Sequence, residues 1–347
     1  GEVGPGNRRE SQTDPSHRRP MFNLGELAMK KSLIALAVIG FSGAAMAQSS
    51  VTLYGVADLG VGKIKTGSPI QPGPNKVEMI GSGMMNNGTS RLGVRGVEDL
   101  GGGLKAGFNF ETGLNAETGA SDSVFWQRAA NLWLGGNWGT FKMGRTLTPS
   151  FYGVAAWELT GTANYSVIGN TYKYINPQVA PTGAIGAGAR NSSQFSYKTP
   201  NLGGFSAEVG YITKQDNGAA KWDANAIYAN GPIGIGLSAN KTSGSKTNYS
   251  LGGKYNFGNF ALATSYNVAH IVNAQRRGFS LGGTATFGAA SVTLDLTRDT
   301  KNQWGSKKYT NGLLEAKYAL SKRTFIYGAY LRLDGDNNYG IGVRHNF

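Results

Sequence analysis

The sequence predicts an all-β fold, a 16-stranded antiparallel transmembrane β-barrel with a long third loop folded into the lumen. Three observations predict it. Large apolar side chains recur at every second residue, about sixteen segments carry this pattern, and the connections between them alternate in length. A strand with one apolar and one polar face has a period of two. A membrane tolerates strands only where closure of the sheet pairs every edge.

Two segments precede the predicted barrel. Residues 1–28 are polar, rich in Pro and Arg, and come before an obvious start residue, Met29, so we interpret them as an upstream mis-start or a cloning remnant. Residues 29–47 combine a charged start, the apolar run 33–41 and a final A-x-A site, the pattern of a secretory signal peptide. The apolar run is too short for a spanning helix. No stop-transfer pattern follows that would favour the alternative, a membrane anchor or buried helix. The barrel then occupies residues 48–347.

Residues 48–347 are basic and contain no cysteine. Residues 1–47 hold six basic and four acidic residues, so without them the net charge of +14 falls to near +12. The basic residues are scattered singly along the predicted strands, so we do not expect nucleic acid as a partner. A water-filled lumen that favours anions fits this charge better. Without disulfides, stability should come from closed hydrogen bonding between strands.

The predicted strands follow one another from residue 51 to the end of the chain. The first, 51–63, places Leu53 and Leu59 on one face and Tyr54 and Asp58 on the other. Such alternation suits a wall with lipid on one side and water on the other. The further predicted strands lie near 89–97, 104–113, 124–135, 140–146, 191–199, 204–214, 222–230, 233–242, 248–257, 260–270, 277–287, 290–298, 309–319, 324–333 and 338–347.

The connections alternate in length, as the two rims of such a barrel do. The longer, polar ones suit the external rim and lie at 64–88, 114–123, 215–221 and 299–308. The short ones suit the periplasmic rim and lie at 98–103, 200–203, 231–232, 258–259, 288–289 and 321–323. Aromatic residues near the segment ends predict an interfacial girdle. They are Phe257, Phe260, Phe287, Tyr318, Phe325 and Phe347.

The final strand carries a strict row of large side chains. Tyr339, Ile341, Val343, His345 and Phe347 occupy every second position, and polar or small residues fill the gaps. We expect this row to face lipid, with the terminal phenylalanine at the membrane interface.

One connection, residues 147–190, breaks the alternation. Loops of this length are usually functional or disordered. This one carries too many aromatic residues for disorder, namely Phe151, Tyr152, Trp157, Tyr165, Tyr172 and Tyr174. It could fold outward as a surface lid. Because a barrel of this size encloses an aqueous channel, we favour a loop that folds into the barrel and narrows it.

Five short sequence motifs together identify a protein family, although each one alone is a weak signal. They are SSVTLYG at 49–55, SRLGVRGVEDLG at 90–101, QR at 127–128, GTFKMGR at 139–145 and RHNF at 344–347. In these motifs the chain resembles the general porins of Gram-negative outer membranes, in their neisserial and β-proteobacterial branch, and the resemblance covers residues 48–347. The resemblance implies a sixteen-stranded barrel, a homotrimer, and a third external loop folded inward as the constriction.

In that family, arginines on the barrel wall face acidic residues on the third loop. Arg91 and Arg95 lie on the polar side of their strand. The position of Arg128 in the alternation of polar and apolar residues (its parity) supports a lumen position only weakly. Ser150 stands where relatives often carry an acid, which leaves Glu158 as the only acid of the loop and favours anions. For each arginine the alternative is a solvated charge at the rim. The residues expected at the constriction are Arg91, Arg95, Arg128, Arg190, Glu158 and Tyr152.

We therefore predict a passive diffusion channel for small hydrophilic solutes and ions across the cell outer membrane, with a modest anion preference. The alternative is a substrate-specific anion channel, for phosphate or organic acids. An enzyme is not expected, because His270 and His345 come with no nucleophile motif or metal-ligand cluster, and no cofactor or metal is predicted. Expected partners are two further copies of the chain, outer-membrane lipid and lipopolysaccharide, and the barrel-assembly machinery, which by resemblance reads Phe347 as part of its signal.

Overall fold

The computed structural model describes residues 50–65, 75–177 and 189–347. All of them belong to one compact unit, Gln48–Phe347. The interpretations of residues 1–47 as a mis-start followed by a signal peptide lie outside the described residues.

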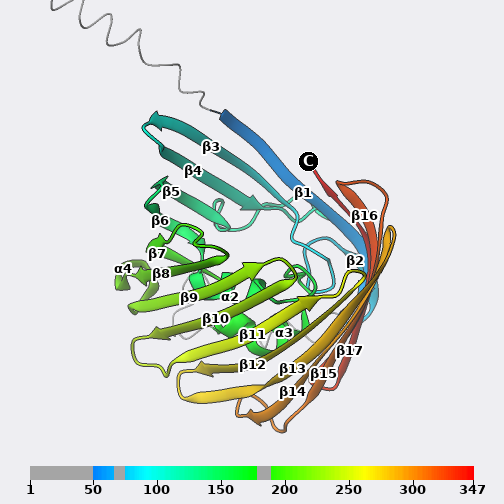
Figure 1. The fold of residues 1–347 in the computed structure, drawn as a ribbon. Helices are drawn as coiled ribbons and strands as arrows, with labels where there is room; N and C mark the ends of the chain where they lie inside the picture. Colours follow the sequence, from blue (N-terminus) through cyan, green and yellow to red (C-terminus); the bar gives the residue numbers. More distant parts are fainter. Residues whose placement is uncertain (1–49, 66–74, 178–188) are drawn as a thin grey trace, which may run out of the picture. The chain divides into compact units, whose positions relative to one another are not determined.

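The described residues form one sheet of 17 strands, in which every strand pairing is antiparallel (Figure 1). Strand β1 (Ser50–Lys63) closes the sheet, because its first half pairs with β3 (Arg91–Gly101) and its second half with β17 (Asp336–Asn346). The four-residue strand β2 (Val77–Ile80) pairs with the end of β1. Setting β2 aside leaves 16 barrel strands, so the predicted 16-stranded barrel is confirmed.

The remaining strands follow in chain order, each paired with the next. They are β4 (Leu104–Gly113), β5 (Ala129–Gly136), β6 (Gly139–Leu147), β7 (Arg190–Lys198), β8 (Phe205–Ile212), β9 (Lys221–Asn230), β10 (Ile233–Thr242), β11 (Asn248–Asn256), β12 (Phe260–Ile271), β13 (Ala274–Phe287), β14 (Ala290–Asn302), β15 (Thr310–Ala319) and β16 (Thr324–Leu333).

The closing seam involves the last residue of the chain. The backbones of Gly55 and Phe347 exchange two hydrogen bonds of 3.0 and 3.1 Å. A Cβ atom at Gly55 would lie 2.3 Å from Cζ of Phe347, so only glycine leaves room for the ring there. The predicted outward row of β17 is present, since Ile341 and Val343 are 67% and 47% exposed.

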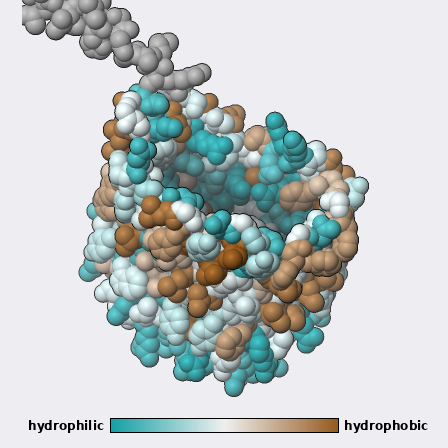
Figure 2. Space-filling model, viewed as in Figure 1, coloured by the Kyte–Doolittle hydropathy of each residue, from teal (hydrophilic) through white to brown (hydrophobic). Residues whose placement is uncertain are grey.

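Apolar side chains point outward and polar ones inward along most strands. In β14, Leu294 and Leu296 are exposed, whereas Asp295 and Thr297 beside them are buried. Figure 2 shows the consequence, with hydrophilic side chains gathered in the hollow of the barrel. Since successive residues of a strand point to opposite faces, the pattern of period two was sufficient to predict both faces.

Several strand boundaries differ by a few residues from the predicted ones. Strand β5 begins at Ala129 rather than near 124, because the chain turns just before it and the Gln127 amide donates to the Val124 carbonyl at 3.2 Å. Strand β14 continues to Asn302, because its residues keep pairing with β13 as far as Arg276. The following connection therefore covers 303–309 rather than 299–308.

Four short helical segments occur in the described residues. The connection between β6 and β7 holds α2 (Pro149–Ala155), α3 (Val167–Tyr172) and the 3-10 helix η1 (Lys173–Ile175), and α4 (Lys214–Asn217) follows β8. No helix in this described part of the chain is long and apolar enough to cross a membrane.

Candidate pore constriction

The long loop lies against the polar face of the sheet. Helix α2 contacts β9 and β10, and its backbone comes so close that a Cβ at Gly236 of β10 would lie 1.8 Å from the Gly153 carbonyl oxygen. Next to it, a Cβ at Gly234 would lie 2.7 Å from the carbonyl oxygen of Ala156. Because the polar face of the closed sheet is its inner face, the described part of the loop lies inside the barrel (Figure 1).

Buried polar contacts hold the first half of the loop. The Thr148 side chain caps α2 by accepting a hydrogen bond from the Phe151 amide at 3.2 Å. The Asp223 carboxylate on β9 accepts bonds from the Ser150 amide at 2.6 Å and the Ser150 hydroxyl at 3.0 Å. Lys221 lies 3.1 Å from the same carboxylate. The charge of Asp223 is therefore paired and hydrogen-bonded, which burial of a charge requires.

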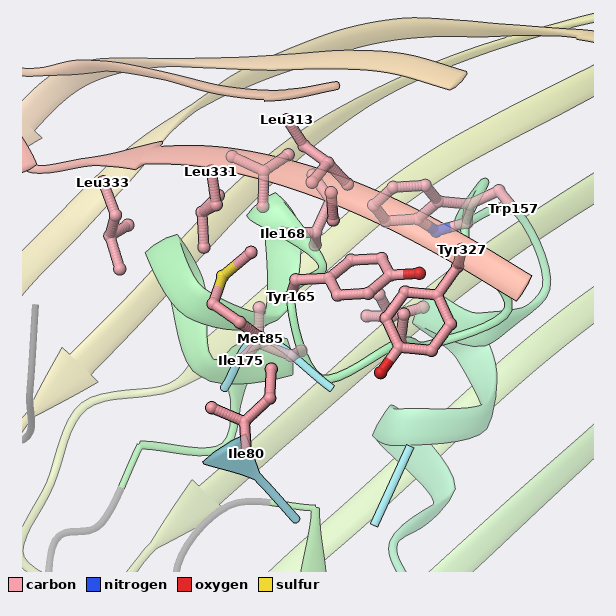
Figure 3. Close-up of a cluster of buried hydrophobic side chains, with 14 residues drawn as sticks. Ile80, Met85, Trp157, Tyr165, Ile168, Ile175, Leu313, Tyr327, Leu331 and Leu333 are labelled. Carbon is pink, nitrogen blue, oxygen red and sulfur yellow. The ribbon is translucent and has the colours of Figure 1, made fainter. Parts of the chain in front are cut away.

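An apolar cluster inside the barrel holds the second half. Trp157, Tyr165 and Ile168 of the loop are at most 1% exposed, and they pack with Leu313 of β15 and Leu331 of β16. Figure 3 shows these side chains meeting between the loop and the wall. Each such side chain contributes roughly 1.5–3 kcal/mol by leaving water. Inward leucines are exceptions to the polar inner face, and they mark the place where the loop docks.

Three of the predicted arginines lie together on the other side of the lumen. Arg91 is on β3, Arg128 precedes β5, and Arg190 begins β7. The Arg190 Nε donates to the Arg128 carbonyl oxygen at 2.9 Å, and the charges of Arg91 and Arg128 both act on Arg190. The fold thus gathers like charges from three separate parts of the chain.

One carboxylate, Glu111 of β4, stands among these arginines. Its Oε1 accepts a hydrogen bond of 2.6 Å from Arg128 Nε, and its Oε2 lies 3.8 Å from Arg91 Nε. The Tyr54 hydroxyl donates to Oε2 at 2.8 Å. Glu111 therefore orients the guanidinium groups of Arg91 and Arg128 but neutralises only one of the three positive charges around it.

Arg95 extends the basic surface along β3. Its guanidinium carbon lies 4.9 Å from the centre of the Tyr54 ring, and its side chain is exposed. Such stacking orients the cation and leaves its donors available to water.

A small cavity lies between the loop and the arginine wall. It has a volume of about 170 Å³ and is lined by residues that include Glu111, Arg128, Lys142, Tyr152 and Arg190. Burial raises the pKa of the Tyr152 hydroxyl to about 12, so this group stays neutral at physiological pH. The cavity thus presents several cationic donors, two neutral hydroxyls and one carboxylate, a set suited to transient contact with small anions.

The structure does not bring Glu158 to the arginines. This residue is 2% exposed, and its carboxylate accepts hydrogen bonds of 2.9 and 2.6 Å from the amide and hydroxyl of Thr160. The Thr162 amide and the Ser166 hydroxyl each donate to it at 2.7 Å. Glu158 closes a turn of the loop, and the acid beside the arginines comes from the wall.

The sequence argument missed Glu111, Tyr54 and Lys142 as members of the site. Because Glu111 follows the apolar Phe110 on the same strand, the period of two puts it on the polar face, but this period cannot say which charges will surround it. Arg128 gave a weak parity signal because it precedes β5, where the period of a strand does not apply.

Comparison with known proteins identifies the fold and its setting. A sequence model described as Gram-negative porin matches residues 32–338. The chain belongs to the Gram-negative porin family. Its motifs had indicated this resemblance, which the match confirms. The porin is located in the outer membrane, and its lumen is the channel.

Two relatives match this porin over nearly their whole length. It is 35% identical over 340 residues to Outer membrane porin protein 32 of Delftia acidovorans, covering 91% of this chain and 93% of the relative. It is 28% identical to Major outer membrane protein P.IB of Neisseria meningitidis serogroup A, covering 92% and 100%. Among solved structures, the anion-selective porin from Comamonas acidovorans matches with a TM-score of 0.71 and 29% identity, covering 86% of this chain and all of that one.

Proposed function

We propose that this porin lets small hydrophilic solutes and ions diffuse passively across the outer membrane, with a modest preference for anions. The observation that carries the proposal is the excess of guanidinium groups over the single carboxylate of Glu111 beside them. The name of the similar solved protein, an anion-selective porin, supports it. The constriction consists of Arg91, Arg95, Arg128, Arg190 and Tyr152 together with Glu111, and Glu158 serves the loop.

Fixed charge in a narrow aqueous passage accounts for the preference. Low-dielectric walls focus the field of the arginines, which raises the local concentration of anions and lowers that of cations. Guanidinium groups are weakly hydrated and offer several donors to passing anions. Glu111 offsets part of this attraction, so an anion is held weakly enough to leave.

Single-channel recording of the purified porin in planar bilayers tests this function. In a potassium chloride gradient near 0.1 M we expect a reversal potential with the sign of chloride selectivity. The preference should decline near 1 M, because the Debye length falls from about 10 Å to about 3 Å. Clear cation selectivity at low salt would refute the proposal.

A substrate-specific channel for phosphate or organic acids is the second candidate. The cavity of about 170 Å³ beside Arg128 and Arg190 favours it, because a bound anion could be enclosed there. Saturable inhibition of the chloride current by phosphate or a dicarboxylate would establish this candidate. Chloride current that stays unaffected at millimolar concentrations of these solutes would exclude it.

We infer a role as a channel rather than as an enzyme. The His270 ring contacts the side chains of Asn248 and Gln275, and the His345 ring contacts Thr324. The hydrogen bond between the Thr324 hydroxyl and His345 is exposed to solvent, and neither residue lines the cavity beside the arginines. No metal-binding cluster of acids, histidines or cysteines occurs in the described residues.

We further propose that the porin is a homotrimer in contact with outer-membrane lipid and lipopolysaccharide, and that the barrel-assembly machinery recognises Phe347. The position of Phe347 at the seam, 49% exposed, supports a role in insertion. Deleting Phe347 should lower the amount of heat-modifiable oligomer in membranes without lowering synthesis or export. The control is Phe287→Ala, an exposed aromatic near another short turn. Unchanged oligomer after the deletion would contradict the proposed signal.

A further inference from the structure

A groove on the outer face of the barrel has no role in conduction. It lies over β14, β15 and β16, has a volume of about 670 Å³, and has an apolar floor that includes Leu294, Leu296 and Leu314. Gly312 provides its depth, because that position of β15 has no side chain. A Cβ there would lie 2.9 Å from a terminal methyl carbon of Leu296.

Positive charges surround the end of this groove that lies nearest the loop between β14 and β15. Strand pairing sets Arg298 of β14 opposite Thr310, and Arg332 of β16 opposite Gly312, so an arginine flanks β15 on each side. Lys307 and Lys308 add two charges from the following loop. All four cations are exposed. Among the described residues, no carboxylate lies within ion-pair distance of any of them.

The height of these charges places them at the membrane surface. On the outer face of β16, Arg332 is the next residue after Tyr330. Arg332 therefore lies about 7 Å nearer than Tyr330 to the rim that carries the long loops. Tyr330 is exposed, and exposed tyrosines favour the level of the lipid headgroups. In barrels of this kind the rim with long loops faces the outside. The cations therefore lie at the headgroup level of the outer leaflet.

A second groove continues from the first toward the middle of the membrane. The two share Leu314 and Tyr330, and the second is lined by apolar and glycine residues that include Ala316, Gly328 and Ile341. A ligand of this surface would carry negative charge at one end and hydrocarbon chains along the rest.

We propose that the groove over Gly312 binds a phosphorylated glycolipid of the outer leaflet, of the lipid A class. Lipid A carries two phosphates on a disaccharide. The cations extend from β14 to β16, a width of about 10 Å, and thus suit a headgroup with more than one phosphate. This inference refines the proposed contact with lipopolysaccharide and does not depend on the ion preference of the pore.

Lipid titrations of the folded full-length porin, followed by native mass spectrometry, test the site. The probes are lipid A with both phosphates, the same lipid without phosphates, and phosphatidylglycerol. The charge variant is Arg298→Gln with Arg332→Gln. The matched control is Lys241→Gln with Lys246→Gln, which removes two exposed charges from the same rim near β10.

We expect the charge variant to bind lipid A about 30-fold more weakly, since each cation near an anionic surface contributes about 1 kcal/mol. The control should stay within about threefold of the parent protein, because it lies outside the groove. Gly312→Leu keeps every charge but fills the groove, and should also weaken binding. Single-channel selectivity should be unchanged in all variants, which separates this site from the pore.

Four results would overturn the inference. They are equal binding of lipid A without phosphates, equal binding of phosphatidylglycerol, an equal loss of binding in the control variant, and an altered oligomeric state with unchanged lipid binding. The last result would assign the groove to contact between copies of the chain.

Discussion

Arginines on the β3–β7 side of the lumen border an open cavity, whereas several charged residues on the β9–β17 side are buried in ion pairs. Arg190 shows the first situation, because it lines this cavity and no carboxylate of the described residues lies within ion-pair distance of it. Arg276 shows the second. It is 3% exposed, it donates two hydrogen bonds of 3.0 and 2.9 Å to Asp299, and it also pairs with Asp334.

This difference teaches that access to water decides what an arginine contributes. A buried ion pair is costly to break, because removal of one partner leaves the other charge without compensation. A charge that borders water keeps its hydration, so its removal changes the electric field more than the stability. The same residue type therefore joins neighbouring parts of the wall on one side of the lumen and attracts ions on the other.

The largest expected effect comes from the side of the lumen where the long loop packs against the wall. Trp157→Ala removes a ring from the apolar cluster under the loop, and should lower the free energy of unfolding by about 3–5 kcal/mol. Conductance should rise as the loop loses its attachment. Thermal loss of the heat-modifiable form and single-channel recording measure both effects. Trp138→Ala, at an exposed position, is the control. Unchanged conductance in Trp157→Ala would mean that this cluster does not position the loop.

The second largest effect is expected on the side of the lumen where the arginines lie. Arg91→Ser combined with Arg128→Ser leaves Glu111 without its two ion-pair partners, so reversal potentials should move toward cation selectivity. Because the Arg91 and Arg128 side chains are only 23% and 13% exposed and Glu111 loses its partners, the free energy of unfolding should fall by about 1–3 kcal/mol, less than in Trp157→Ala. Lys322→Ser with Arg323→Ser removes two charges from a short turn and should leave selectivity unchanged. A double variant at Arg91 and Arg128 that fails to assemble, while the remaining channels keep their anion preference, would make these arginines structural.

The smallest effect concerns the single acid among the arginines. Glu111→Gln removes its negative charge and should raise the anion preference. The loss of stability should be about 1 kcal/mol, because the amide oxygen of glutamine can still accept from the mostly buried Arg128. Reversal potentials measure the effect. Glu98→Gln is the control, because it removes one negative charge near a short turn, away from Arg91 and Arg128. A shift toward cation selectivity would show that Glu111 does not act on the ions in the pore.

Local pattern in the sequence was enough to predict the wall of the barrel. Period two revealed both faces of β14 and β17, and polar parity placed Arg91 and Arg95 correctly on the inner face of β3. These predictions succeed because the direction of a side chain on a strand depends only on its position along that strand. The motifs added the family, and the unusual length and aromatic content of 147–190 indicated a loop that folds inward.

The tertiary structure alone decided which residues meet. Glu111 stands among arginines from three other segments, while Glu158 turns into its own loop, and no periodicity distinguishes these two acids. Leu313 and Leu331 point inward by their positions along their strands, but only the docked loop keeps these apolar side chains from water, which the sequence of their strands does not reveal. Closure of the barrel and docking of the loop join residues more than a hundred positions apart. Parity determines the face of the wall on which a charge lies, but its neighbours, and therefore its role, depend on contacts across the lumen.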